Sequence, residues 1–161
     1  MNLISGATGF VGGRLLLALD KDSLVTRKLN RIPKELPGSV VADLSDIAAL
    51  TAACAGIETV FHCAGYAHAF SSLSGDNANL HRRINFEGTR NLVEAAGLAG
   101  VRRFVFLSSV KAMAEPGELC VDEDFPGDPV TAYGQSKRAA EAAVLSAGQR
   151  YGMHVVNLRL S

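Results

Sequence analysis

Asn2-Leu3-Ile4-Ser5-Gly6-Ala7-Thr8-Gly9-Phe10-Val11-Gly12 is the stretch that decides the fold of this chain. A short apolar run leads into three glycines spaced three residues apart, and the residues that follow read as a helix over 9–19. A strand, a glycine-rich turn and a helix in this order form the context in which such glycines bind a dinucleotide.

Each glycine has its own physical role in this interpretation. Gly6 permits a tight turn that a β-carbon would obstruct. Gly9 lets the backbone approach a pyrophosphate, and Gly12 lets the helix pack against its strand. The free N–H groups of the helix N-terminus would then face the phosphates. The alternative is a strand-to-helix turn with no ligand, because motif matches carry a false-positive risk.

The rest of the chain alternates between strands and helices. Strands are expected at 23–30, 39–42, 58–63, 101–107 and 153–160, and helices at 46–55, 78–98 and 132–151. Ser45 and Thr131 are the expected N-caps of two helices, Asp76 or Asn77 caps a third, and Gly88 interrupts it. Residues 108–130 read as an irregular stretch. The pattern predicts a single Rossmann-type α/β domain over 1–161, a doubly wound parallel sheet of about six strands.

Composition narrows the class of protein. The chain has 161 residues, and 16 Lys+Arg balance 16 Asp+Glu, so no basic field favours nucleic acid. No apolar run reaches the ~20 residues that a membrane span needs. The three cysteines, Cys54, Cys63 and Cys120, form neither a disulfide nor a metal pattern. These features predict a cytoplasmic protein that binds no membrane, nucleic acid or metal.

The residues after the second predicted strand bear on cofactor choice. NAD-binding sites of this type usually place a carboxylate about 20 residues past the glycines, on the ribose 2′-OH. Here Asn30 and Arg31 occupy that neighbourhood, and the first carboxylate is Glu35. A guanidinium suits a 2′-phosphate, so NADP is mildly favoured over NAD. Arg31 as a solvated loop cation is the alternative.

A candidate catalytic set follows the fifth predicted strand. Tyr133 and Lys137 are four residues apart and share one helix face. An ammonium beside a phenol stabilises the phenolate, which makes the tyrosine usable as an acid or base. Ser108 and Ser109 end the strand, and ligands sit at the carboxyl ends of parallel strands. A serine hydroxyl and the tyrosine could therefore meet at one substrate oxygen.

Taken together, these motifs resemble the extended short-chain dehydrogenase/reductase superfamily, within the NAD-dependent epimerase/dehydratase family that acts on nucleotide sugars. The resemblance covers essentially the whole chain. It is carried by the opening glycines, Asp43-Leu44, Phe61-His62-Cys63-Ala64-Gly65, the helix signature Asn85 to Leu92, Phe106 to Ser109, and Tyr133 to Lys137.

The resemblance implies a role for each matching residue. Tyr133 is the general acid/base, Lys137 binds the nicotinamide ribose and tunes Tyr133, and Ser109 hydrogen-bonds the reacting oxygen. NAD(P) would be held by Gly6, Gly9, Phe10, Val11, Gly12, Arg31, Asp43, Leu44, Cys63, Ala64, Gly65, Tyr133 and Lys137. The substrate would be a UDP- or dTDP-linked sugar. A homodimer would use the 78–98 and 132–151 helices, although the sheet alone could fill their apolar faces.

Two departures from the family pattern shape the expected function. Dehydratases of the family carry an Asp-Glu pair directly after the active-site hydroxyl, whereas Val110-Lys111-Ala112 follows here. This favours an epimerase or a ketosugar reductase. Family members are also about twice as long, so the chain reads as a truncated gene product or an expressed fragment without its substrate domain.

Alternative functions stay open at this point. The chain could be a steroid- or flavonoid-type reductase of the same superfamily, or a non-catalytic NAD(P)-binding fragment or sensor. Among the remaining polar residues, His62 reads as a packed core histidine, while His68 and His81 lack partners at metal spacing. Arg82-Arg83 reads as solvated surface.

Overall fold

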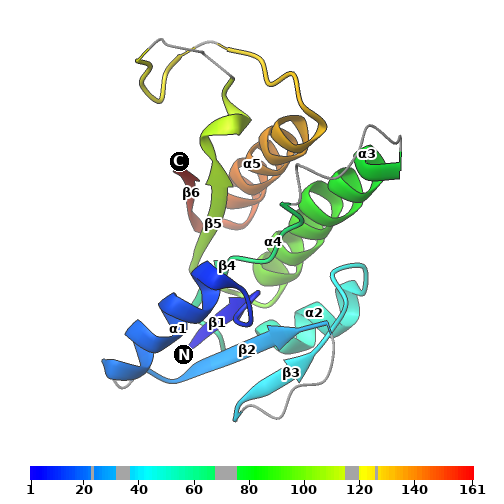
Figure 1. Ribbon diagram of the computed structural model, residues 1–161. Coiled ribbons are helices and arrows are strands. Elements are labelled where there is room, and N and C mark those ends of the chain that lie inside the picture. Colours follow the sequence, from blue (N-terminus) through cyan, green and yellow to red (C-terminus); the bar gives the residue numbers. More distant parts are fainter. Residues whose placement is uncertain (23, 32–36, 68–75, 115–119, 126) are drawn as a thin grey trace.

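A parallel six-stranded sheet forms the centre of the molecule (Figure 1). The computed structural model describes residues 1–22, 24–31, 37–67, 76–114, 120–125 and 127–161. The strands are β1 (Asn2–Ser5), β2 (Thr26–Asn30), β3 (Ser39–Val41), β4 (Thr59–His62), β5 (Arg103–Ser109) and β6 (His154–Leu160). Their spatial order, β3-β2-β1-β4-β5-β6, is that of a Rossmann fold and confirms the predicted fold class.

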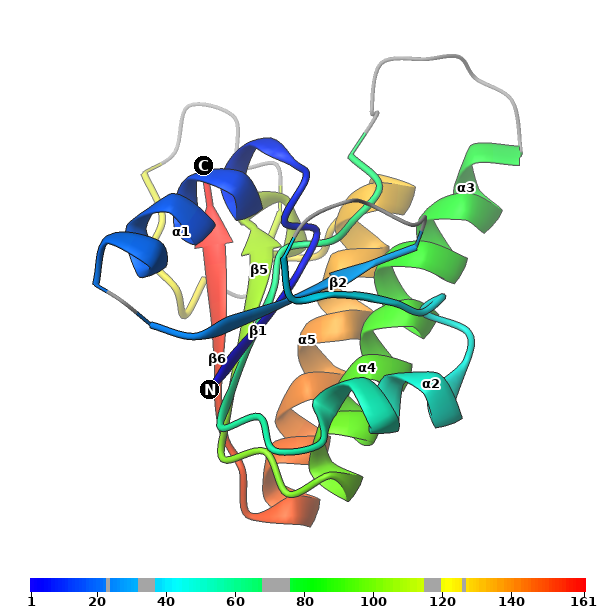
Figure 2. The same cartoon turned by 90° about the horizontal axis from the view of Figure 1, so that it is seen from below.

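The direction of winding reverses between β1 and β4, and the helices divide accordingly. Parallel crossovers are right-handed, so a reversal of direction moves the connecting helix to the other face. Helix α1 (Phe10–Lys21) lies on one face, and α2 (Ile47–Cys54), α4 (Gly88–Leu98) and α5 (Ala132–Tyr151) lie on the opposite face (Figure 2). The helices cover the two faces of the sheet unequally. Among the described residues, α1 is the only helix on its face, and Leu158 and Leu160 of β6 stay exposed.

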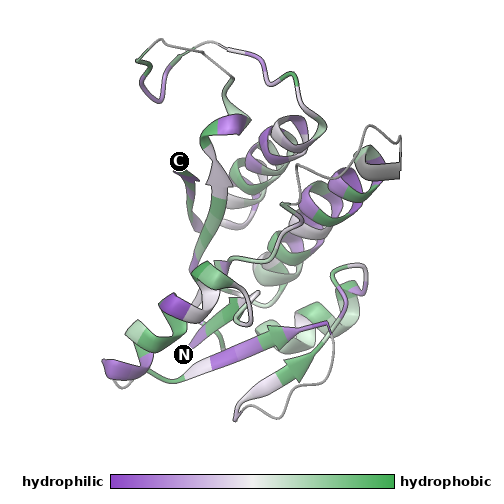
Figure 3. Cartoon of the chain, viewed as in Figure 1, coloured by the Kyte–Doolittle hydropathy of each residue, from purple (hydrophilic) through white to green (hydrophobic). Residues whose placement is uncertain are grey.

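The core lies between the sheet and the three helices on its more covered face. Its largest fully buried apolar side chains come from the central strands and from α2, α4 and α5: Leu3, Leu50, Val60, Leu92, Val93, Phe104, Phe106 and Val144. The central strands are correspondingly apolar along most of their length, whereas hydrophilic residues gather on the outer sides of the helices (Figure 3). Parallel strands that are covered by helices need such near-continuous apolar runs.

The glycine turn brings α1 unusually close to the end of β1. Gly6 has a φ of +74°, a left-handed conformation that L side chains rarely adopt. A β-carbon on Gly12 would collide with the carbonyl oxygen of Gly6. The helix therefore begins at Phe10 with Gly9 as its N-cap, and no side chain caps its first turn.

The long helix predicted over 78–98 is present but differs in detail. It begins at Asp76 as α3 (Asp76–His81), passes through the π-helical segment η1 (Arg82–Glu87), and continues as α4. Gly88 does not interrupt it: its φ and ψ are −62° and −42°, and its N–H donates to the Arg83 carbonyl, five residues back. The irregular part of the helix is therefore the π-helical segment before Gly88. This segment contains no glycine or proline that would have marked it in the sequence.

The predicted helix caps have different outcomes. Thr131 caps α5 as predicted, since its hydroxyl accepts the Gly134 N–H at 3.2 Å. Ser45 is not the cap of α2: Asp46 takes that position and accepts the Ala49 N–H at 2.9 Å.

The predicted irregular stretch, residues 108–130, contains the short 3-10 helix η2 (Val110–Ala112). Residues 115–119 and 126 of this stretch lie outside the described residues. None of the described helices is long and apolar enough to cross a membrane.

The approach of α1 to the glycine turn can be tested with two neighbouring glycines. Gly12→Ala should lower the free energy of unfolding by about 2 kcal/mol, because its methyl group overlaps the Gly6 carbonyl. Gly13→Ala is the control, since its β-carbon would lie 3.4 Å from the Ala7 carbonyl oxygen and alanine favours a helix. Urea unfolding of both variants measures the difference; equal stability would contradict this account of the turn.

Candidate active site

A cleft of about 930 Å³ runs along the carboxyl edge of the sheet. It lies at the switch point between β1 and β4, where open parallel sheets bind their ligands. Eight of the predicted cofactor-binding residues line it: Gly6, Gly9, Arg31, Asp43, Leu44, Cys63, Ala64 and Gly65. The wall that faces these residues is formed by one side of the helical segment 83–91, with Arg83, Ile84, Glu87, Gly88 and Asn91 lining the cleft.

A second cleft of about 300 Å³ adjoins the first and contains the predicted catalytic residues. Ser109, Tyr133 and Lys137 all line it. The two clefts share Cys63, Gly65 and Tyr66, so they form one continuous surface. Residues that are far apart in sequence are thus brought to one edge of the sheet, where the glycine motif borders both clefts and the Ser-Tyr-Lys set lines the smaller one.

Lys137 is the most unusual charged group of the site because it is buried. Only 5% of the residue is exposed, and its Nζ donates to the Leu107 carbonyl oxygen at 2.7 Å. The ammonium also lies 4.5 Å from the centre of the Phe106 ring, a cation–π contact. Burial lowers the pKa of Lys137 from 10.5 to about 8, because loss of water disfavours the charged form.

Tyr133 and Ser109 reach the second cleft from two elements that pack tightly. A β-carbon on Gly134 would collide with the Lys111 carbonyl oxygen, so the start of α5 lies directly against η2. Ser109 precedes η2, and its hydroxyl accepts the Lys111 N–H at 3.3 Å. Its neighbour Ser108 also lines this cleft, and the Ser108 hydroxyl is buried without a hydrogen-bond partner in the described part of the chain.

Asn85 is a site residue whose role the sequence pattern did not indicate. It is 1% exposed, and its amide clamps the backbone of Tyr66, accepting the Tyr66 N–H at 2.7 Å and donating to the Tyr66 carbonyl at 3.0 Å. The same amide donates to the Ser136 hydroxyl at 3.2 Å, and Ser136 donates to the Tyr133 carbonyl at 2.7 Å. Asn85 therefore connects the segment after β4 to the helix that carries Tyr133 and Lys137.

His62 continues this network beneath the cleft and is fully buried, as expected for a core histidine. Its Nε2 lies 2.9 Å from the Thr89 hydroxyl, which itself donates to the Asn85 carbonyl at 2.6 Å. Thr89 must then accept from Nε2, which leaves Nδ1 to accept from the Ser5 hydroxyl. Burial lowers the pKa of His62 to about 3, so this neutral tautomer persists at ordinary pH.

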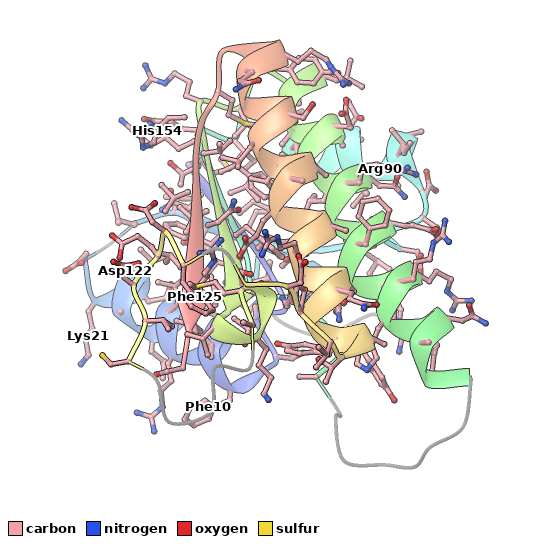
Figure 4. The ribbon with its side chains drawn as sticks, turned by 90° about the horizontal axis from the view of Figure 1, so that it is seen from above. Phe10, Lys21, Arg90, Asp122, Phe125 and His154 are labelled. Carbon is pink, nitrogen blue, oxygen red and sulfur yellow. The ribbon has the colours of Figure 1, made fainter. Side chains whose placement is uncertain are left out.

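Three predicted residues of the opening glycine motif, Phe10, Val11 and Gly12, lie outside the larger cleft. Phe10 lines neither cleft: it is 81% exposed, and Figure 4 shows it at the periphery of the molecule. Val11 lines the smaller cleft, and Gly12 is buried beneath the turn.

His81 packs among aromatic rings. The centre of its ring lies 4.9 Å from that of Tyr66 and 5.6 Å from that of Tyr133. No cluster of metal-ligating side chains exists among the described residues.

Comparison with known proteins places this site in a family. The model of the NAD dependent epimerase/dehydratase family matches residues 2–161, and the chain belongs to that family. A 3-beta-hydroxysteroid dehydrogenase of Mycolicibacterium neoaurum is 32% identical, with 99% of this chain and 46% of that protein covered. A UDP-glucose 4-epimerase of Vibrio cholerae is also 32% identical, with 98% and 50% covered.

A solved structure shows the same relationship. It is a short-chain dehydrogenase/reductase superfamily protein from Agrobacterium tumefaciens with bound NAD, with a TM-score of 0.87 and 35% sequence identity. The match covers 99% of this chain and 48% of that one. The chain thus spans about half the length of the curated relatives it matches.

The buried ammonium of Lys137 should leave a signature in the pH dependence of stability. Its pKa is about 8 in the folded chain and 10.5 when exposed. The unfolded state therefore binds more protons between these values, and stability should rise with pH across that window. Relative to Lys137→Met, which cannot titrate, the free energy of unfolding should gain about 2 to 3 kcal/mol from pH 7 to pH 10. Parallel stability curves for the two proteins would contradict the burial of a charged amine.

Proposed function

We propose that this chain is the NAD(P)-binding part of an epimerase or ketosugar reductase that transfers hydride at a sugar carbon of a UDP- or dTDP-linked sugar. The observation that carries the proposal is the continuous surface that joins the glycine turn to Ser109, Tyr133 and Lys137. The likeness to a UDP-glucose 4-epimerase at 32% identity supports the substrate class.

The residues of the larger cleft fit a dinucleotide. Gly6 and Gly9 expose backbone where a side chain would fill the cleft, and the uncapped first turn of α1 offers N–H groups to phosphates. The Asp43 carboxylate, held by the Ser45 N–H and hydroxyl at 2.9 and 2.7 Å, can accept from an adenine amino group. When bound, NAD(P) supplies the hydride chemistry, and the protein supplies position and proton transfer.

Proton transfer is the task of the smaller cleft. In the direction of reduction, Tyr133 donates its phenolic proton to the oxygen of a ketosugar, and in the direction of oxidation the phenolate takes the proton back. The Lys137 ammonium stabilises that phenolate and can donate to ribose hydroxyls. Ser109 donates a hydrogen bond to the same substrate oxygen. Val110 and Lys111 stand where a dehydratase would need carboxylates, so elimination of water is not proposed.

A second candidate function has a specific observation in its favour. The 3-beta-hydroxysteroid dehydrogenase of Mycolicibacterium neoaurum is as similar to this chain as the epimerase is. Oxidation of a secondary steroid alcohol would use Ser109, Tyr133 and Lys137 in the same roles. A non-catalytic sensor of NAD(P) is disfavoured, since binding alone has no need of this set. Assays with UDP-sugars and with 3β-hydroxysteroids separate the two enzymes.

The acid/base assignment predicts a defined effect of removing one oxygen. Tyr133→Phe should lower turnover by about 100-fold or more, because the reacting oxygen loses its proton donor. Its affinity for NAD(P)H should change little. Activity on UDP-sugars and fluorescence titration with NADPH measure the two effects in the protein that contains this chain. Turnover by Tyr133→Phe at the unaltered rate would remove Tyr133 from the mechanism.

We also propose a preference for NADP over NAD, although the similar Agrobacterium protein was crystallised with NAD. Arg31 lines the cleft directly after β2, so a guanidinium occupies the position where a carboxylate would hold the ribose 2′-OH. The chain should bind NADPH more tightly than NADH, and Arg31→Ala should reduce that ratio by about tenfold. Calorimetric titration measures both affinities. An unchanged ratio in Arg31→Ala would make this residue a solvated surface cation.

A further inference from the structure

The charged residues that line the larger cleft are unequally satisfied. They are Arg31, Asp43, Arg83 and Glu87. Asp43 accepts two hydrogen bonds from Ser45, and Glu87 accepts the Arg82 guanidinium at 3.1 Å. Within the described residues, by contrast, the side chains of Arg31 and Arg83 donate no hydrogen bond, and both residues are exposed and line the cleft. The cleft therefore holds two cationic forks with free donors.

The helix turns Arg83 toward the cleft. Arg83, Ile84, Glu87, Gly88 and Asn91 form one stripe along the cleft wall. The stripe is held in place at its far end, since the Asn91 amide donates to the Leu44 carbonyl at 2.9 Å. A β-carbon on Gly88 would lie only 2.9 Å from the Leu44 side chain, so helix and loop are in close contact there.

Arg83 and Arg31 line the same cleft as the Asp43 carboxylate. Leu44 follows Asp43, and both guanidiniums act on the Asp43 carboxylate. The pKa of Asp43 is lowered first by the Ser45 hydroxyl and N–H, and then by the positive charges of Arg31 and Arg83. Arg31, which follows β2, and Arg83, in η1, thus present two positive charges to one cleft, and both act on the Asp43 carboxylate.

We infer that Arg83 is a second binding residue for the 2′-phosphate of NADP(H) and acts with Arg31 to select it over NAD(H). This inference rests on the proposed NADP preference. A phosphate monoester presents three acceptor oxygens and matches guanidinium forks that approach from two sides. Asp43 stays with the adenine, because its Oδ1 already accepts both hydrogen bonds from Ser45 and its negative charge would repel a phosphate.

Arg82 provides a matched control. It is the preceding residue in η1, but its side chain is 71% exposed, pairs with Glu87 and does not line the cleft. Loss of positive charge from η1 as a whole would affect Arg82→Ala and Arg83→Ala alike. A direct contact with the 2′-phosphate would affect Arg83→Ala alone.

The experiment compares two fragments of the cofactor by calorimetric titration. 2′,5′-ADP carries the 2′-phosphate, and 5′-AMP lacks it. In Arg83→Ala the preference for 2′,5′-ADP should fall by about tenfold, whereas Arg82→Ala should keep it within about twofold. Arg83→Lys should retain only part of the preference, because an ammonium keeps the charge and loses the fork. The preference of the unaltered chain should also weaken with added salt.

Each of the other possible results contradicts either this inference or the NADP preference on which it rests. If Arg31→Ala loses the preference and Arg83→Ala keeps it, the inference is wrong and the proposed preference stands. If Arg83→Ala weakens both fragments equally, Arg83 acts on the adenosine or the 5′-phosphate, which both fragments carry, and not on the 2′-phosphate. If the unaltered chain binds both fragments alike, the NADP preference fails and the inference fails with it. Each variant should unfold at the same midpoint temperature as the unaltered chain, which excludes a folding defect as the cause of a lost preference.

Discussion

The buried ammonium of Lys137 is the constraint on which the site depends. A buried cation is costly unless it is hydrogen-bonded, and here the partners are the Leu107 carbonyl and the face of Phe106, both on β5. These partners fix α5 against the end of β5, and Gly134 permits the close approach. Because Tyr133 lies one turn earlier on the same helix, the position of the lysine also sets the position of the phenol relative to Ser109.

A second constraint ties the two clefts into one. From Ser5 at the end of β1, hydrogen bonds pass through His62 and Thr89 to Asn85, whose amide holds Tyr66 and Ser136. Asn85 lies in the π-helical segment η1, which packs against α5. One set of buried polar groups thereby connects the glycine turn to the helix that carries Tyr133 and Lys137, although the two lie far apart in the sequence.

Much of this was predictable from the sequence. The alternation of apolar strands with helices, the Gly6-Gly9-Gly12 turn, the Thr131 cap and the grouping of Ser109, Tyr133 and Lys137 depend on local signals and on sheet topology. The π turn was not predictable, because no helix-breaking residue within Arg82–Glu87 marks it. Ser45 and Asp46 are equally good caps by type, and only the pairing of Ser45 with Asp43 decides between them. Arg83 was missed for a similar reason: which of two adjacent arginines faces a cleft depends on the phase of the helix.

The central claim is that one continuous surface serves both a dinucleotide and the Ser-Tyr-Lys set. The most direct measurement is a crystal structure of this chain grown with NADPH. The account predicts that the nicotinamide ribose contacts Lys137 and Tyr133, and that the pyrophosphate lies against the turn that contains Gly9. Density for the cofactor away from Lys137, or a larger cleft that stays empty at saturating NADPH, would contradict it.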